Sequence, residues 1–221
     1  MGTAIGDVLG TAVGVAISPV PIIALILMLF SRAATRNGVS FLAGWLVGLV
    51  GVGLVVLAVG LEASDEGESD SSGVLKIIIG ALFVLLGWRQ WKGRPRGGEE
   101  PAMPGWMTAI DDFSSAKSFG MGILLTVLNP KNLGLTVAAA ATIGSAGLSG
   151  GEEAVTLLLF VAIASLTIAA PIALYLLVRE RAETMLDAMK EWLVANNNTV
   201  MTVLFVVLGA KVLGDGIAIL A

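Results

Sequence analysis

Residues 8–30 read VLGTAVGVAISPVPIIALILMLF, an apolar run that Pro19 and Pro21 interrupt near its middle. A proline inside a helix removes a backbone hydrogen bond and clashes with the preceding turn, at a cost of roughly 3 kcal/mol in water. A second apolar run, Phe119 to Ile143, contains the related interruption Asn129-Pro130-Lys131-Asn132. Broken helices at membrane depth face protein or a water-filled cavity, because the freed carbonyls need other partners. The two proline motifs therefore indicate where function is located.

The composition predicts an integral membrane protein. The chain of 221 residues is 56% hydrophobic and 14% charged, with a mean hydropathy of +0.91. A run of roughly 20 apolar residues is needed to cross a hydrocarbon core. Six apolar runs are candidates: Val8 to Phe30, Val39 to Leu61, Val74 to Trp88, Phe119 to Ile143, Val155 to Val178 and Val200 to Ala221. We therefore expect an all-α fold with six transmembrane helices.

Basic and acidic connections alternate along the chain. Arg32 follows the first run, Arg89 the third and Arg179 the fifth, whereas the second and fourth connections carry acidic residues such as Glu62 and Glu152. Short loops rich in lysine and arginine stay in the cytoplasm. This pattern predicts a multi-pass protein of the plasma membrane with both termini outside.

The chain divides into two predicted halves, residues 1–94 and 118–221, joined by a cytoplasmic linker over residues 95–117. Three spans in each half place the halves in opposite orientations, as two inverted three-helix repeats. The proline-broken helix comes first in each half. Interruptions at corresponding positions of inverted halves point to a transport site near the membrane midplane. Between Glu180 and Ala195, apolar residues recur at spacings of three and four, which predicts a helix along the cytoplasmic interface.

The two proline motifs supply the predicted substrate pathway. Its residues are Ser18, Pro19, Pro21, Asn129, Pro130, Lys131 and Asn132. Lys131 is the main candidate, because an ionisable side chain in mid-span costs about 2.5–3.5 kcal/mol and is therefore expected to be functional. It either engages an anionic group or titrates during transport, or it pairs with a carboxylate to lock helices together. The first motif carries no charge, so it either contacts substrate through hydroxyl and backbone groups or acts as a hinge.

Three further charged residues are candidates for ion or proton coupling. Lys211 and Asp215 lie four positions apart in the sixth run, so they share a helix face and can form an ion pair that points inward. A coupling relay and a structural pair are the two alternatives. Asp7 lies at the outer edge of the first run and is a weaker candidate. For this residue, a solvated position at the membrane boundary is favoured over a coupling role.

Small residues recur in the first and second runs. Gly2, Gly6, Gly10 and Gly14 are spaced by four, and Gly44 and Gly48 repeat that spacing. Such stripes let helices approach closely. We expect them to serve packing within the bundle, with a homodimer seam as the alternative.

Several classes of activity are disfavoured. The chain has no cysteine and no histidine, which excludes disulfides and removes the commonest metal ligands and proton shuttle. No paired catalytic carboxylate, no nucleophile beside a base and no phosphate-binding loop is evident. We expect no enzyme activity, no metal site, no cofactor and no nucleic-acid partner.

The order of motifs resembles a known family. Its residues are Ile17-Ser18-Pro19-Val20-Pro21, Phe41-Leu42-Ala43-Gly44-Trp45, Ile110-Asp111-Asp112, Gly120-Met121-Gly122 and Leu128-Asn129-Pro130-Lys131-Asn132-Leu133. They resemble the actinobacterial GAP family, or sulfolipid-1-addressing protein family, within the lysine-exporter (LysE) superfamily. The resemblance covers nearly the whole chain. It implies a six-span transporter built from inverted repeats that helps to move cell-envelope glycolipids toward the surface.

Three functional hypotheses follow. The leading one is an exporter that moves an envelope glycolipid or similar amphiphile by alternating access around the paired breaks, with membrane lipids as partners. The second is an exporter of a small charged substrate, an amino acid or a cation. The third is a non-transporting membrane scaffold that assists envelope-lipid export.

Overall fold

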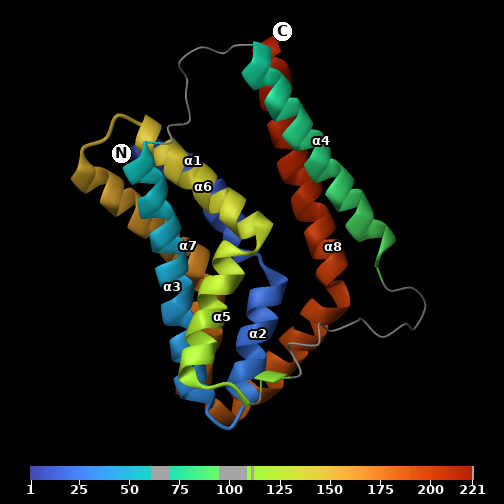
Figure 1. Cartoon of the computed structure of the whole chain (residues 1–221). Helices are drawn as coiled ribbons and strands as arrows, with labels where there is room; N and C mark the ends of the chain where they lie inside the picture. Colours follow the sequence, from blue (N-terminus) through green and yellow to red (C-terminus); the bar gives the residue numbers. More distant parts are fainter. Residues whose placement is uncertain (61–69, 95–108, 111, 221) are drawn as a thin grey trace. The chain divides into compact units, whose positions relative to one another are not determined.

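A computed structural model describes residues 1–60, 70–94, 109–110 and 112–220, which form helices and their connections without a strand. Within these residues, eight α-helices follow one another (Figure 1). They are α1 (Gly2–Ala16), α2 (Pro19–Phe30), α3 (Ala34–Val59), α4 (Asp70–Lys92), α5 (Ser115–Val127), α6 (Pro130–Ser145), α7 (Gly150–Leu177) and α8 (Arg179–Leu220). The predicted all-helical fold is confirmed for these residues.

The helices include several candidate membrane spans. Among the described residues, α3, α7 and α8 from Arg181 are long and apolar enough to cross a membrane alone. The bent pairs α1–α2 and α5–α6 raise the count to as many as five. The predicted third span lies within α4, which is not among these candidates, so the set of six spans is not confirmed. Most of the predicted linker, residues 95–108 and 111, and Glu62 of the acidic connection lie outside the described residues.

The chain forms two compact units. The first contains α1, α2, α3, α5, α6, α7 and the start of α8, up to Glu191, and the second contains α4 and the rest of α8. Each unit thus combines elements from both predicted halves of the sequence. The division into halves with a linker stays a prediction.

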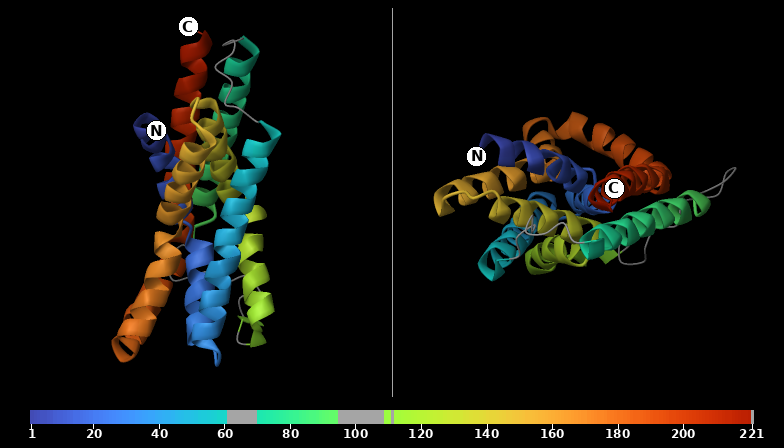
Figure 2. Two further views of the ribbon diagram at one scale, coloured as in Figure 1. Left: turned by 90° about the vertical axis from the view of Figure 1, so that its left-hand side faces the viewer. Right: turned by 90° about the horizontal axis from the view of Figure 1, so that it is seen from above.

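Glycines let α3 and α5 cross closely in the first unit, where the two helices lie side by side (Figure 2). A Cβ atom at Gly44 would strike the backbone of Phe119, and one at Gly122 would strike the backbone of Phe41. A Cβ atom at Gly48 would meet the side chain of Thr126. The prediction that Gly44 and Gly48 serve packing within the bundle is therefore confirmed.

The glycine stripe of α1 behaves differently. Added Cβ atoms at Gly2, Gly6 and Gly10 would meet nothing within 4 Å, and only Gly14 packs closely, against Leu135 of α6. The expectation of bundle packing is wrong for the first three glycines. They lie on the exposed face of α1, whereas the buried face packs against α6 and α7. The alternative, a homodimer seam, stays a prediction.

The second unit is a pair of helices joined along a seam of glycines. The seam consists of Gly73, Gly80 and Gly87 on α4 and of Gly209 and Gly216 on α8. On each helix, neighbouring glycines of the seam lie seven positions apart. Phe83 and Phe205 stack beside the seam with ring centroids 5.9 Å apart. The spacing of seven returns to the same helix face after two turns, which lets the two backbones approach along their length.

The predicted interfacial segment, Glu180 to Ala195, belongs to α8 without a break in the helix. In the part that belongs to the first unit, Ala182 and Leu186 are buried, whereas Met185 is exposed. Lys190 lies over the ring of Phe30 in α2, with its Nζ 5.4 Å from the ring centroid. The start of α8, up to Glu191, therefore packs within the first unit as an amphipathic helix.

Candidate functional site

The first break separates α1 from α2 and bends the chain by 53°. Pro19 and Pro21 lie in the first turn of α2, and both side chains are buried. Pro19 takes the first helical position, where a backbone N–H would have no partner within the helix. The N–H of Ser18 donates to the Ala16 carbonyl at 2.9 Å. In a continuous helix that N–H would donate to the carbonyl of Gly14, and an N–H at position 21 would donate to that of Ile17. The turn and Pro21 therefore leave both carbonyls without a helical donor.

The second break separates α5 from α6 with a bend of 68°. Asn129 is the N-cap of α6, and its side-chain oxygen accepts from the backbone N–H groups of Lys131, at 3.1 Å, and Asn132, at 3.5 Å. Pro130 takes the first helical position, where its missing N–H costs nothing. This break is thus capped by its own sequence.

Lys131 reaches from the second break into the first. Its Nζ donates to the Gly14 carbonyl at 2.6 Å and to the Ile17 carbonyl at 2.9 Å, and the residue is 3% exposed. Both carbonyls are among those that the first break leaves without a helical donor. The positive charge also lies at the C-terminal end of α1, the negative end of the helix dipole. Among the described residues, the partners of Lys131 are backbone carbonyls and not the carboxylate that the predicted alternative requires.

Asn132 connects the two breaks by a second route. Its Oδ1 accepts from the Ser18 hydroxyl at 2.7 Å, and its Nδ2 donates to the Leu125 carbonyl of α5 at 3.1 Å. Ser18 is 2% exposed and Asn132 is fully buried. The Ser18 hydroxyl makes no cap bond to its own helix and bonds across the break instead. All seven predicted pathway residues thus lie at these two adjoining breaks.

Sequence reasoning missed Thr167 of α7. Its hydroxyl donates to the Ala16 carbonyl at 2.6 Å and so adds a third long-range hydrogen bond to the end of α1. A single threonine inside an apolar run carries no signal of its own in the sequence. Its partner is 151 positions away, so only the folded chain shows this contact.

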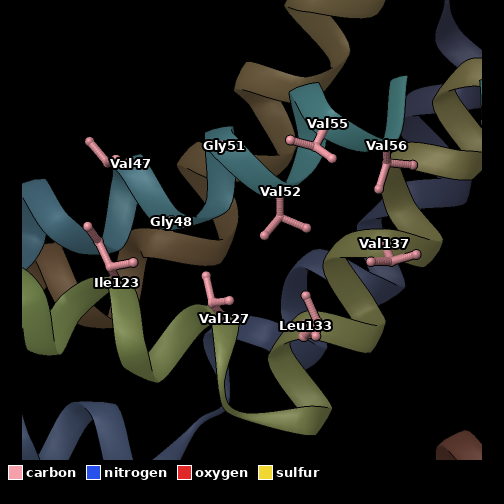
Figure 3. Close-up of a pocket in the computed structure, with 10 residues that line it drawn as sticks. All are labelled: Val47, Gly48, Gly51, Val52, Val55, Val56, Ile123, Val127, Leu133 and Val137. Atoms are coloured by element: carbon pink, nitrogen blue, oxygen red, sulfur yellow. The ribbon is translucent and has the colours of Figure 1, made fainter. Parts of the chain in front are cut away.

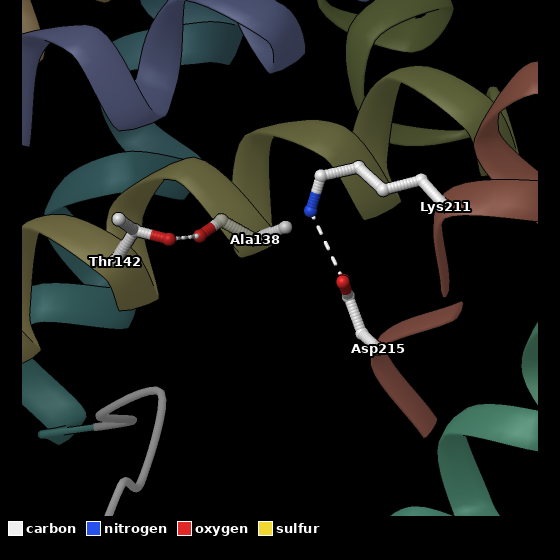
Figure 4. A network of polar contacts seen from close by, with 4 residues as sticks. All are labelled: Ala138, Thr142, Lys211 and Asp215. Carbon is white, nitrogen blue, oxygen red and sulfur yellow. Dashed lines mark hydrogen bonds and ion pairs between the residues drawn. The ribbon is translucent and has the colours of Figure 1, made fainter. Parts of the chain in front are cut away.

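The other charged candidates lie elsewhere. Lys211 and Asp215 form the predicted ion pair in the second unit, with Nζ 3.0 Å from Oδ2 (Figure 4). Their side chains are 73% and 47% exposed, so this unit does not cover the pair as the inward-pointing expectation requires. Asp7 is exposed on α1. Their coupling role stays a prediction.

An apolar groove runs beside the second break, between α3, α5 and α6 (Figure 3). Its volume is about 430 Å³, and its lining contains no charged or polar side chain. The lining residues are Val47, Gly48, Gly51, Val52, Val55, Val56, Ile123, Val127, Leu133 and Val137. A second apolar hollow of about 390 Å³ lies between α2 and α5 and is lined by Val20, Leu125, Leu128, Asn129 and Pro130 among others. Apolar space therefore flanks α5 where it meets the break.

A polar hollow lies at the other end of α2. It is lined by Ser31, Arg32, Tyr175, Glu183 and Asp187 among others, and its volume is about 710 Å³. A smaller hollow of about 400 Å³ shares Arg32 and adds Arg36. The first unit thus offers apolar space at the breaks and charged groups at the end of α2.

Comparisons with known proteins place the chain in a family. The family described as Sap, sulfolipid-1-addressing protein, matches residues 8–218. No curated protein and no solved structure matches. The match includes both breaks and the groove, and membership of the wider LysE superfamily stays a prediction. The chain therefore belongs to the sulfolipid-1-addressing protein family.

Proposed function

We propose that this protein moves an envelope glycolipid or a similar amphiphile across the plasma membrane. The observation that carries the proposal is the apolar groove of about 430 Å³ beside the second break. Ligand sites of this size with apolar walls suit hydrocarbon, whereas a small hydrophilic solute needs convergent polar groups. The family, named for addressing a sulfolipid, supports involvement in lipid export.

The groove suits an acyl chain because of how it is built. Gly48 and Gly51 give α3 a flat surface, while Val127 and Leu133 close the groove at the break between α5 and α6. Placing apolar chains against this wall leaves no polar group unpaired. The lipid head would then lie near the polar residues of the breaks.

Alternating access is the proposed mechanism, with the two broken helix pairs as corresponding parts of inverted repeats. In the described conformation, the Lys131 ammonium donates hydrogen bonds to the carbonyls of Gly14 and Ile17. For Lys131 to engage an anionic head group, it must leave these carbonyls in another conformation. Lys131 is thus proposed both to close the breaks and to meet substrate charge when they open.

Filling the groove tests the proposal. Gly51 lines the groove, and an added Cβ atom there meets nothing within 4 Å, so Gly51→Phe places a ring in the groove without a backbone clash. In proteoliposomes, we expect this variant to move a fluorescent anionic glycolipid several-fold more slowly than the natural protein. The matched control is Gly134→Phe, at an exposed glycine with equally open surroundings outside the groove.

The same assay separates the alternatives. Equal rates for Gly51→Phe, Gly134→Phe and the natural protein would rule out the groove as the lipid path. Transport of a small amino acid or a cation without lipid movement would favour the second hypothesis. Lipid export in cells combined with no movement by the purified protein would favour the scaffold.

A further inference from the structure

The end of α1 presents backbone oxygens that face a positive charge. In a broken helix the last carbonyls have no intrahelical donor, and the helix dipole gives that end partial negative charge. Unwound carbonyls and half-helix C-termini are the groups with which membrane transporters hold small cations. Here the carbonyl oxygens of Gly14 and Ile17 converge on one nitrogen, the Nζ of Lys131.

The cation at this position belongs to the protein itself. Lys131 comes from α6, its contacts to the first break span 117 and 114 positions, and the residue is 3% exposed. Within the described part of the chain, Lys131 has no salt-bridge partner. Among the described residues, backbone carbonyl oxygens alone accept hydrogen bonds from this buried ammonium.

We propose that the C-terminal end of α1 is a binding site for a primary ammonium ion, and that Lys131 fills it as a tethered cation. When the ammonium of Lys131 is removed, the site takes ammonium or a primary alkylammonium ion from solution. This inference concerns the break itself and does not depend on what the protein transports.

The chemistry of the site selects this class of cation. The two contacts, at 2.6 and 2.9 Å, are hydrogen-bond distances, and an ammonium group directs separate N–H bonds at separate oxygens. Calcium and magnesium require several oxygens including carboxylates, which these contacts do not supply. A quaternary ammonium ion has no N–H to donate.

The first test removes the tether. Lys131→Ala deletes three side-chain carbons and the ammonium, which together correspond to n-propylammonium. We expect the melting temperature of the detergent-solubilised variant to fall by roughly 5 °C or more, because two buried carbonyls lose their donor. Millimolar n-propylammonium should restore most of this loss, with saturation.

Three controls distinguish a site from a solvent effect. n-Propanol has a similar shape without charge, and tetramethylammonium has charge without a donor, so neither should restore stability. Lys131→Met fills the space without an ammonium, so n-propylammonium should not stabilise it. An unchanged melting temperature for Lys131→Ala, or equal stabilisation of Lys131→Ala and Lys131→Met by n-propylammonium, would overturn the proposal.

A second variant keeps the proposal testable if Lys131→Ala does not fold. The chain has no cysteine, so Lys131→Cys introduces a single thiol. Its thiolate displaces bromide from 2-bromoethylamine and gives a side chain of lysine length with a terminal ammonium. Alkylation with bromoethane gives the neutral counterpart. Recovery of the folded state only with the ammonium-bearing group supports the site, and equal recovery with both groups contradicts it.

Discussion

The two helix breaks share a sequence pattern but satisfy their backbones differently. In each, a polar residue precedes a proline that begins the next helix: Ser18 before Pro19 and Asn129 before Pro130. Asn129 caps its own helix, whereas Ser18 makes no cap bond. The second break also satisfies the Leu125 carbonyl from seven positions away, through Asn132.

The first break depends on distant residues. Its carbonyls at Gly14, Ala16 and Ile17 receive side-chain donors from Lys131 and Thr167, more than 110 positions away. A break that caps itself can stay rigid while its surroundings move. A break held by distant donors can open when those donors leave, so we expect α1–α2 to be the more mobile of the two pairs.

The largest expected effect is on the first break. Lys131→Met leaves the carbonyls of Gly14 and Ile17 without a donor and should lower the free energy of unfolding by roughly 2–4 kcal/mol. The measurement is unfolding of the protein in mixed detergent micelles, followed by tryptophan fluorescence. Lys211→Met is the control, because the Lys211–Asp215 pair is exposed and such pairs contribute little.

The role of Pro21 sharpens this prediction. Pro21→Ala restores an N–H that can donate to the Ile17 carbonyl, so the ammonium becomes partly redundant. Lys131→Met should therefore cost about 1 kcal/mol less in the Pro21→Ala background, which a double-mutant cycle measures. Strict additivity would show that Pro21 does not create the need for Lys131.

Asn132 links the two breaks, so its loss should affect both. Asn132→Ala removes the acceptor for the Ser18 hydroxyl and the donor for the Leu125 carbonyl. We expect a loss of about 2 kcal/mol, against about 1 kcal/mol for Ser18→Ala. The double variant should lose less than the sum, and an additive result would show that the Ser18–Asn132 bond contributes nothing.

The N-cap of α6 at the second break, Asn129, should also contribute to stability. Asn129→Ala should destabilise the protein by about 1 kcal/mol, because the first backbone N–H groups of α6 lose their acceptor. The same unfolding assay checks this. Asn129→Ser, which keeps a capping oxygen, should recover most of the loss.

The smallest effect is expected at Thr167. The Ala16 carbonyl already accepts from the Ser18 N–H, so Thr167→Val should cost only about 0.6 kcal/mol. The control is Thr142→Val, because the Thr142 hydroxyl bonds the Ala138 carbonyl within its own exposed helix turn (Figure 4). A larger loss at Thr142 than at Thr167 would show that the contact between α7 and the first break is unimportant.

Much of the fold could be read from the sequence because prolines and apolar runs act locally. The helix breaks at Pro19 and Pro130 and the ion pair of Lys211 and Asp215 depend on neighbours within a few positions. The packing prediction is wrong for Gly2, Gly6 and Gly10, because their spacing shows that they share a helix face but not which way that face points.

The partners of Lys131 could not be predicted for a related reason. A buried lysine suggests a carboxylate partner, because opposite charges attract and acidic residues can be located directly in the sequence. Every residue has a carbonyl, so no pattern marks the carbonyls of Gly14 and Ile17 as acceptors. Their availability depends on the turn at Ser18 and on the missing N–H of Pro21.

A helical membrane protein with two proline-broken helices can be predicted from the sequence, because hydrophobicity and proline geometry are properties of short segments. The folded chain was needed to show that Lys131 of one break bonds the carbonyls of the other and that glycines of α3 line a groove beside it. The contacts of Lys131 join residues more than 110 positions apart, and the groove joins helices that are also distant in the sequence. Both depend on packing within the first unit.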